Sequence, residues 1–376
     1  MKILVQIIVL SLTVHVFSQD RFVINNATVF DGEEVYQNTS VLVEDGSISK
    51  VAKKIKFKGE VIDGTGKFLM PAMMNTHVHA WSPASTREAA QNGILHLFDM
   101  HGMEEMQKGM KAMNADSTSA RYLTAGYAAT AKDGHGTQYG FPVPVLEKPE
   151  DAKQWVKDRV DAGADHIKII VEPWKNTLSY DVVEAIINEA HTHDKVAVVH
   201  VSHLKDAVAV LKRGADGLVH IWDDENMSPQ QLIELTKEHD FFVIPTIITN
   251  YLVQEAYFNK TKEEATEKLT WLQRETKALY DAGIPILAGT DPPNANINYS
   301  TDLFKEMQYF KDAGIPALGV LKTATSNPAK QFKLEKVGYI KPGFTADLVL
   351  LDKNPLLDMN NLSTTLHVWK AGKYVK

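Results

Sequence analysis

The amino-acid sequence predicts an α/β fold: a (β/α)8 TIM-like barrel with a small β-sandwich domain built from both chain ends. Two observations support this prediction. The long middle of the chain alternates apolar strands with amphipathic helices, which is typical of a parallel sheet, and eight such units favour closure into a barrel. Both ends instead carry short strand-like runs separated by turns. The length of 376 residues fits one barrel with a small second domain.

The N-terminus has the pattern of a secretory signal peptide. Lys2 precedes an apolar run over residues 3–17, and Ser18 provides a small residue for cleavage. We therefore expect a signal peptide over residues 1–18 and a secreted or periplasmic protein. The apolar run is short for a membrane span, so we expect no stable span after cleavage. An uncleaved anchor is the alternative.

Strand-like runs occur with similar spacing at the two ends of the mature chain. An example near the N-terminus is Phe22–Ile24, and one near the C-terminus is Asp347–Leu351. The short runs and their turns suggest antiparallel pairing. We expect residues 19–69 and 335–376 to pair into one composite β-sandwich domain, and residues 70–334 to form the barrel.

The barrel elements follow in order along the middle of the chain. Two of the expected helices begin with a capping-box pattern, formed by Ser228 with Gln231 and by Thr261 with Glu264. The strands between the helices are short and apolar. The eight predicted barrel strands are Pro71–His79, Ile94–Phe98, Arg121–Ala125, His166–Val171, Val196–Val199, Leu218–Val219, Phe241–Ile244 and Pro285–Ala288.

Composition narrows the classes of function. The chain is 44% hydrophobic and 23% charged, as in an ordinary globular protein, and its formal net charge is −7. Because the balance is acidic and no basic patch stands out, we expect no nucleic-acid partner. The chain has no cysteine, so any metal site must use nitrogen and oxygen ligands.

Side chains of the metal-ligand type end several of the predicted strands. His77 and His79 are two residues apart on the first strand, so both imidazoles lie on the same face. Farther along, His200, His220 and Asp291 each follow an apolar strand. The carboxyl ends of the strands meet at one face of a barrel, so we expect these side chains to converge. The set predicts a metal site.

Lys168 lies within an otherwise apolar strand. A buried ammonium is costly unless it is paired, and nearby imidazoles and cations would make it costlier. An uncharged amine that has added carbon dioxide would instead be a carbamate, whose two oxygens can bridge two cations. The alternative is a lysine that reaches the barrel rim or pairs with an acid. Together with Asp291 and a bridging hydroxide, a carbamate would supply the negative charge that two divalent cations need.

Several segments, in this order, resemble those of the metal-dependent amidohydrolase superfamily, and most closely its imidazolonepropionase-like and Xaa-Pro dipeptidase-like members. The resemblance covers nearly the whole mature chain. Departures lie around the pocket: Ala72 replaces a frequent Gly, Trp222 follows the strand-six histidine, and Glu172 begins a loop that is often Gly-rich. They bear on the substrate rather than on the chemistry. The resembling segments are Pro71–His79, Gly163–Lys168, Val196–Leu204, Ala215–His220, Ala288–Asp291, Lys341–Gly343 and Ala346–Val349.

The resemblance implies a ligand set and a reaction. Carbamylated Lys168 would bridge two divalent ions, for which zinc is expected. A metal-bridged hydroxide would attack a polarised carbonyl, and Asp291 would move the proton of the water to the leaving amine. The implied ligands are His77, His79 and Asp291 for one ion, His200 and His220 for the other, and Lys168 between them.

The resemblance also implies a hydrolase of carbon–nitrogen bonds that acts on a small-molecule amide, here expected to be a dipeptide or an N-acyl amino acid. Two alternatives stay open: the same site could hydrolyse a cyclic amide, lactone or ester, or the chain could be a non-catalytic barrel relative. His203 argues against deamination, because many deaminating relatives have Glu at that step. The sequence leaves room for a homo-oligomer. The candidate substrate contacts, in loops at the predicted barrel mouth, are His135, Tyr139, Trp174, Trp222 and Tyr251.

Overall fold

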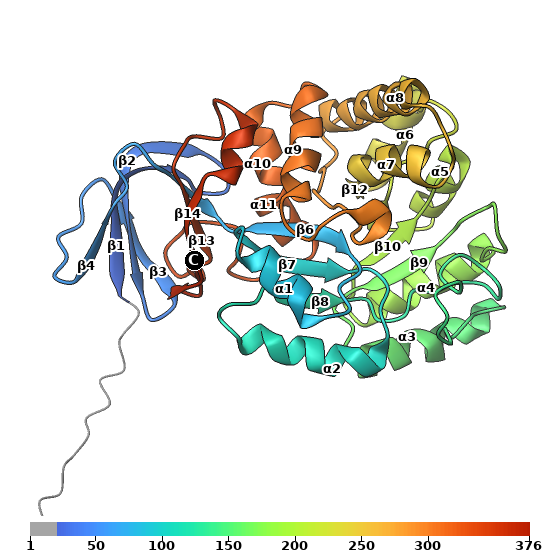
Figure 1. Ribbon diagram of the computed structural model, residues 1–376. Coiled ribbons are helices and arrows are strands. Elements are labelled where there is room, and N and C mark those ends of the chain that lie inside the picture. The colour runs from blue at the N-terminus through green and yellow to red at the C-terminus, as the bar shows by residue number, and fades with distance from the viewer. Residues whose placement is uncertain (1–20) are drawn as a thin grey trace, which may run out of the picture.

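The computed structural model describes residues 21–376 of the chain (Figure 1). The predicted signal peptide, residues 1–18, lies outside this range. Within the range, no helix combines the length and the apolar character that crossing a membrane requires.

Strands from both chain ends share one eight-stranded sheet, which lies at the left of Figure 1. The strands are β1 (Phe22–Phe30), β2 (Val35–Glu44), β3 (Ser47–Ala52), β4 (Glu60–Asp63), β5 (Phe68–Pro71), β13 (Leu348–Leu351), β14 (Thr365–Lys370) and β15 (Lys373–Tyr374). Their order is β15-β14-β13-β5-β1-β2-β3, and β4 pairs with β1. One face buries an apolar cluster that includes Ile24, Val41 and Leu350. The hydrogen-bond pattern is that of a single sheet, and it does not by itself divide into the two sheets of the predicted sandwich.

Seven short parallel strands form two further sheets in the middle of the chain. The strands are β6 (Met73–Val78), β7 (Ile94–Asp99), β8 (Arg121–Thr124), β9 (Ile167–Ile170), β10 (Ala197–His200), β11 (Gly217–Val219) and β12 (Phe242–Ile244). One sheet has the order β6-β7-β8 and the other β12-β11-β10-β9. Each strand begins and ends within about two residues of its predicted bounds, as expected of sequence-based boundaries.

Backbone hydrogen bonds link the two parallel sheets on one side through the segment that follows β8. The Ala129 N–H donates to the carbonyl oxygen of Lys168 at 2.8 Å, and the Ile170 N–H donates to that of Ala129 at 2.9 Å. Ala129 therefore lies beside β9 as a second parallel strand would, on the side away from β10, although it contributes only an isolated bridge to Ile169.

The second link between the sheets is the predicted eighth strand, Pro285–Ala288. It pairs with β12 through a single parallel bridge between Ile286 and Val243. On its other side, the Thr76 N–H of β6 donates to the carbonyl oxygen of Ala288 at 2.9 Å. Because both links are isolated contacts, the parallel strands form two separate sheets rather than one closed hydrogen-bonded barrel.

Helices pack around the parallel strands (Figure 1). The α-helices are α1 (Pro83–Ala90), α2 (Glu104–Ala112), α3 (Ala152–Asp161), α4 (Tyr180–Thr192), α5 (Leu204–Leu211), α6 (Pro229–Glu238), α7 (Ile247–Ala256), α8 (Lys262–Asp281), α9 (Asp302–Asp312), α10 (Ala317–Thr323) and α11 (Ser326–Gln331). Short 3-10 turns lie at Met113–Ala115, Pro149–Asp151, Asn294–Asn296 and Met359–Ser363. Both predicted capping boxes are present, at Ser228 before α6 and at Thr261 before α8.

Alternate residues of the parallel strands face two different apolar cores. Phe98 and Val198 belong to a cluster that strands of both sheets share, and Phe332, just after α11, packs into it. Leu97 and Val199 belong to the larger cluster that also holds the buried faces of the helices. Burial on both faces explains why these strands read as nearly continuous apolar runs.

Candidate metal centre

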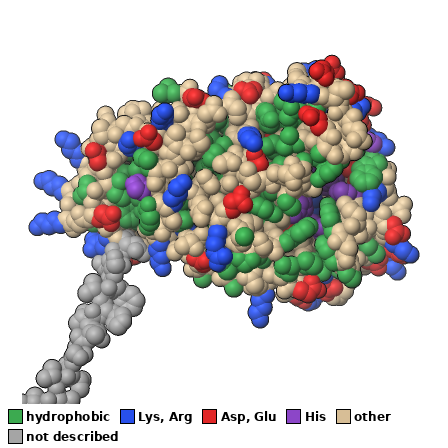
Figure 2. Space-filling model, viewed as in Figure 1, with side chains coloured by type: hydrophobic (Ala, Val, Ile, Leu, Met, Phe, Trp, Pro, Cys, Tyr) green, Lys and Arg blue, Asp and Glu red, His purple; other side chains and the backbone are tan. Residues whose placement is uncertain are grey.

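The predicted ligands gather at the carboxyl ends of the parallel strands. On the face shown in Figure 2, histidine side chains reach the surface beside hydrophobic ones, in the region where β9 and β10 lie in Figure 1. This is the end of the sheet at which α/β enzymes place their active sites. The six ligand candidates are His77 and His79 at the end of β6, Lys168 within β9, His200 at the end of β10, His220 after β11, and Asp291 beyond the bridge at Ile286.

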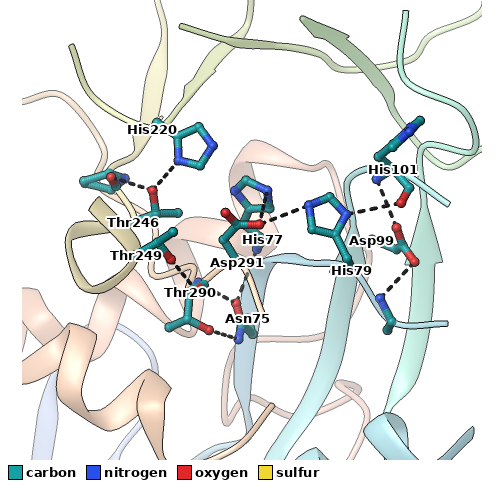
Figure 3. Close-up of polar contacts among 12 residues, drawn as sticks. Asn75, His77, His79, Asp99, His101, His220, Thr246, Thr249, Thr290 and Asp291 are labelled. Carbon is teal, nitrogen blue, oxygen red and sulfur yellow. Dashed lines mark hydrogen bonds and ion pairs between the residues drawn. The ribbon is translucent and has the colours of Figure 1, made fainter. Parts of the chain in front are cut away.

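Three of these residues form a compact cluster (Figure 3). His77, His79 and Asp291 each offer a ligand atom, and these atoms lie within 4.8 Å of one another. Asp291 Oδ1 is 3.0 Å from His79 Nε2 and 3.3 Å from His77 Nε2. Within residues 21–376 this buried oxygen nevertheless has no partner in hydrogen-bond geometry. A buried carboxylate oxygen that faces two imidazole nitrogens without bonding to them fits a cation between the three.

Hydrogen bonds to the far ring nitrogens orient two of the imidazoles (Figure 3). His79 Nδ1 lies 3.2 Å from the carbonyl oxygen of His101, which can only accept, so Nδ1 carries the proton. His220 Nδ1 lies 2.5 Å from Thr246 Oγ1, and this hydroxyl donates to the carbonyl oxygen of Pro245. The hydroxyl therefore accepts from His220. Both histidines keep the Nε2 lone pair free for a metal.

Three residues around the site have left-handed backbone conformations. The φ angles are 67° at His220, 47° at Thr246 and 55° at Asp291. Residues other than glycine are uncommon in this region, and a β-branched residue such as Thr246 is a true outlier there. Conformations of this kind cost about 1–3 kcal/mol each and concentrate at functional sites. These three lie where strands end and the candidate ligands begin, although other non-glycine residues with positive φ, such as Asn38 and Lys333, lie elsewhere in the described chain.

Five imidazoles form a continuous arc. Ring centroids are 5.4 Å apart for His79 and His77, 4.9 Å for His77 and His220, 4.6 Å for His220 and His200, and 5.0 Å for His200 and His135. Burial lowers the pKa of His77, His200 and His220 well below the ordinary value, and nearby positive charges lower it further. These rings are therefore neutral near pH 7, which is the form that binds a metal.

Lys168 is buried beside this arc, with 3% of its surface exposed. Across residues 21–376, its amine takes part in no ion pair and no hydrogen bond. Burial lowers the pKa of Lys168 to about 7, and the charge of Asp291 opposes the shift only in part. A substantial fraction of the amine is therefore uncharged near neutral pH. An uncharged, unpaired amine in this position satisfies the chemical condition for carbamate formation.

Glu172 and Ser202 flank His200. In the sequence, Glu172 stands out only as a departure around the pocket, and Ser202 has no predicted role. Glu172 Oε2 lies 2.9 Å from His200 Nε2, and Glu172 Oε1 accepts a hydrogen bond from Ser202 Oγ at 2.7 Å. The sequence offered one signal, an acidic residue directly after the strand that carries Lys168. Its contact with His200 depends on how the ends of β9 and β10 lie side by side.

His101, just after β7, joins the metal cluster to a neighbouring loop. Its carbonyl oxygen accepts from His79, as described above. Its ring accepts the Ala128 N–H at Nδ1, at 2.9 Å, and donates from Nε2 to the carbonyl oxygen of Gly136 at 3.1 Å. These contacts fix the neutral tautomer of His101. They also hold the loop that carries His135 against the end of β7.

Asn75 fastens β6 to the segment that carries Asp291 (Figure 3). Its side chain donates to Thr290 Oγ1 at 2.7 Å and accepts the Thr290 N–H at 3.1 Å. The Asp291 N–H donates to the carbonyl oxygen of His77 at 2.7 Å. Side-chain and backbone bonds together therefore set the separation between the two histidines of β6 and Asp291.

Three of the predicted substrate contacts lie at the mouth of the site. The His135 ring is 5.0 Å from that of His200 and 5.6 Å from that of Trp174, which is 64% exposed. The Tyr139 ring is 5.8 Å from that of His101. These positions place polar and aromatic groups around the entrance, as a small-molecule site requires.

The other two predicted contacts lie elsewhere. Trp222 is fully buried, and its indole N–H donates to Glu275 of α8 at 3.3 Å, so the prediction that it lines the pocket is wrong. An aromatic residue after a strand can turn into the helix layer instead. Tyr251, on α7, has its ring 6.2 Å from that of Tyr309 on α9, and its role stays a prediction.

Comparison with known proteins gives a consistent result. The profile of the amidohydrolase family matches residues 68–375. Ochratoxinase from Aspergillus niger is 22% identical over an alignment of 420 residues, which covers 92% of this chain and 84% of that protein. A 5-methylthioadenosine/S-adenosylhomocysteine deaminase from Caldicellulosiruptor saccharolyticus is 23% identical, with 89% of this chain and 85% of that protein covered.

Solved structures show the same fold. A Xaa-Pro dipeptidase with bound methionine superposes with a TM-score of 0.82 at 22% identity, over 94% of this chain and 99% of that one. A putative prolidase from Bifidobacterium longum gives 0.81 at 22% identity, over 94% of each chain. The His77, His79 and Asp291 cluster suits the metal dependence that is general in the amidohydrolase family. Because the family profile spans most of the sequence, the chain belongs to the amidohydrolase family and is a hydrolase of carbon–nitrogen bonds.

Proposed function

We propose that this chain is a binuclear metal-dependent amidohydrolase that cleaves an amide bond in a small substrate, a dipeptide or an N-acyl amino acid. The observation that carries the proposal is the convergence of four imidazoles, Lys168 and Asp291 at the carboxyl ends of the parallel strands. Imidazole, carboxylate and carbamate form the nitrogen and oxygen donor set that two divalent cations need in a protein without cysteine.

The proposed ligands divide between two ions, most simply zinc. Carbon dioxide adds to the uncharged Nζ of Lys168, which forms a nitrogen–carbon bond and releases one proton. The carbamate would supply two oxygen donors and one negative charge in place of a buried amine that has no partner among residues 21–376. The residues that would hold the ions are His77, His79 and Asp291 for the first, His200 and His220 for the second, and Lys168 for both.

When bound, the ions activate a water molecule and polarise the scissile carbonyl group. The carboxylate of Asp291, through the oxygen that the ion leaves free, would accept the proton of the attacking water. The water oxygen bonds to the carbonyl carbon, the carbon–nitrogen bond breaks, and Asp291 delivers the proton to the leaving amine. The residues around the cluster keep these groups in place.

The mouth of the site supports a substrate with an amino-acid leaving group. In the proposal, His135 holds the carboxylate of the leaving group, and Tyr139 and Trp174 flank an apolar or aromatic part. The similar structures described above, a Xaa-Pro dipeptidase and a putative prolidase, support a peptide-like substrate. His203, which would be Glu in many deaminating relatives, lies 3.7 Å from Asp206. A histidine in place of this glutamate gives no support to deamination.

Three further features belong to the proposal. Residues 70–334 take the strand arrangement of a TIM-like barrel, although their hydrogen-bonded strands divide into two sheets. Residues 19–69 and 335–376 form a separate β-sandwich domain, and residues 1–18 direct export to the periplasm or the exterior. The same site acting on a cyclic amide, lactone or ester is the alternative function, and a non-catalytic relative is the second.

Metal analysis and a substrate panel test the proposal together. The panel contains dipeptides and N-acyl amino acids, with lactones, esters and an aminopurine nucleoside as controls. We expect about two ions per chain and turnover of amides. Hydrolysis confined to lactones or esters would reject the amidase, and no turnover of any compound would favour the non-catalytic alternative.

Lys168→Ala tests the carbamate, with Lys370→Ala as a matched control. Lys370 is also buried, with 4% of its surface exposed. Its amine donates to the backbone carbonyl oxygens of Asn114, Asp116 and Ser119, none of which is a candidate ligand. Lys168→Ala should lose metal and activity, with partial rescue by short carboxylic acids, while Lys370→Ala keeps its metal. Full metal content and full turnover in Lys168→Ala would remove the carbamate from the mechanism.

A further inference from the structure

Glu172 stands directly after β9 and divides its carboxylate between two partners. One oxygen faces His200 Nε2 at 2.9 Å, and the other accepts from Ser202 Oγ at 2.7 Å. The Glu172 N–H donates to Thr177 Oγ1 at 3.1 Å. Only 4% of the residue is exposed. Ser202 and Thr177, which lie outside the ligand set, thus help to fix its orientation.

The contact with Glu172 decides which nitrogen of His200 is free. A carboxylate only accepts hydrogen bonds, so the imidazole proton sits on Nε2 and the lone pair on Nδ1. Nδ1 is then the atom available to a cation. The ring centroid of His220, the other ligand proposed for the same ion, lies 4.6 Å from that of His200. Without the carboxylate, the ring could carry its proton on either nitrogen.

We propose that Glu172 is a positioning residue for the second ion, which holds His200 as the Nε2–H tautomer and presents Nδ1 to the metal. The inference rests on the proposed binuclear site. A carboxylate behind a metal-bound histidine fixes the tautomer and ring orientation and raises the basicity of the ligand, and its loss typically costs 10–100-fold in metal affinity. Ser202 supports the arrangement by donating to Oε1, the carboxylate oxygen of Glu172 that does not face His200.

A purely structural role for Glu172 makes different predictions. In that case the carboxylate would only fasten the loop from Glu172 to Thr177 onto β10. Its removal would lower the stability of the metal-free protein, and the affinities for both ions would fall together. The positioning role acts on one ion alone, because His77, His79 and Asp291 make no use of Glu172.

The experiment titrates metal-free protein with zinc against a competing chelator and resolves two dissociation constants. His220→Ala removes a ligand of the second ion and so shows which of the two binding steps, the tighter or the weaker, belongs to that ion. Glu172→Ala should weaken that step by roughly 10–100-fold and leave the other unchanged. Glu172→Gln, which can still accept from Nε2–H, should retain most of the affinity. Ser202→Ala should cause a smaller loss of affinity for the second ion. This variant replaces Glu172→Ala as the test if Glu172→Ala does not fold.

Glu189→Gln is the matched control, because Glu189 Oε1 also faces a histidine, His193 Nε2, at 3.2 Å on helix α4 away from the ligand set. It should change neither step. Unchanged affinity for the second ion in Glu172→Ala, or equal losses at both steps, would overturn the positioning role while leaving the binuclear site intact. A native protein that binds only one ion would overturn the binuclear site and this inference together.

Discussion

Gly289 is packed so closely against β6 that a single methyl group should disturb the metal cluster. A Cβ atom built on Gly289 would lie 2.5 Å from Ile244 Cγ2, 2.9 Å from His77 Cβ and 3.0 Å from His77 N. Protein side chains do not tolerate such distances, so either β6 or the segment leading to Asp291 must shift. Overpacking of this kind costs about 1–3 kcal/mol. We expect Gly289→Ala to lose that much free energy of unfolding and to bind the first ion more weakly.

Urea unfolding of the metal-free protein measures the stability, and chelator competition measures the metal affinity. Gly109→Ala in helix α2 is the matched control, because a Cβ atom there meets nothing within 4 Å. Alanine should stabilise that helix by roughly 0.5–1 kcal/mol and leave the metal affinity unchanged. A Gly289→Ala protein that is as stable as the native chain and binds the metal as tightly would refute the packing of His77 against this segment.

Three further substitutions probe residues in and around the parallel strands. Asn75→Ala leaves Thr290 Oγ1 without its partner and leaves the Thr290 N–H only its longer contact, 3.3 Å, with the carbonyl oxygen of His77, so urea unfolding should show a loss of roughly 1–3 kcal/mol; a loss below about 0.5 kcal/mol would contradict it. Burial lowers the pKa of His96 from 6.5 to about 3, so the unfolded chain binds a proton that the folded one excludes, and stability falls as the pH drops below 6.5. Relative to His96→Leu, the native protein should lose about 2 kcal/mol between pH 7 and pH 5, whereas parallel profiles would reject the assignment. His135→Ala should raise KM strongly for carboxylate substrates and little for their amidated analogues, and equal losses on both would exclude carboxylate binding.

Much of the fold could be predicted because its signals are local. Alternating apolar strands and capped helices depend on neighbouring residues, and the capping boxes at Ser228 and Thr261 are confirmed. The gathering of His77, His79 and Asp291 follows from the rule that parallel strands end at one face. The eighth strand shows the limit of this reasoning. Pro285–Ala288 is apolar enough for a strand, but it forms a single bridge rather than a ladder.

The residues that the sequence missed act through contacts between distant segments. Glu172 touches His200 only because the ends of β9 and β10 lie side by side, and His101 reaches Gly136 across a loop. No spacing in the sequence encodes either contact. Trp222 shows the opposite error, since its position after a ligand strand suggested the pocket, while its side chain turns into the helix layer.

Zinc titration of the metal-free protein in isotopically labelled bicarbonate tests the binuclear site most directly. We predict saturation at about two ions per chain, together with a carbamate carbon resonance that Lys168→Ala abolishes and Lys370→Ala retains. Saturation at a single ion, or two bound ions with an unmodified Lys168, would contradict the proposed centre.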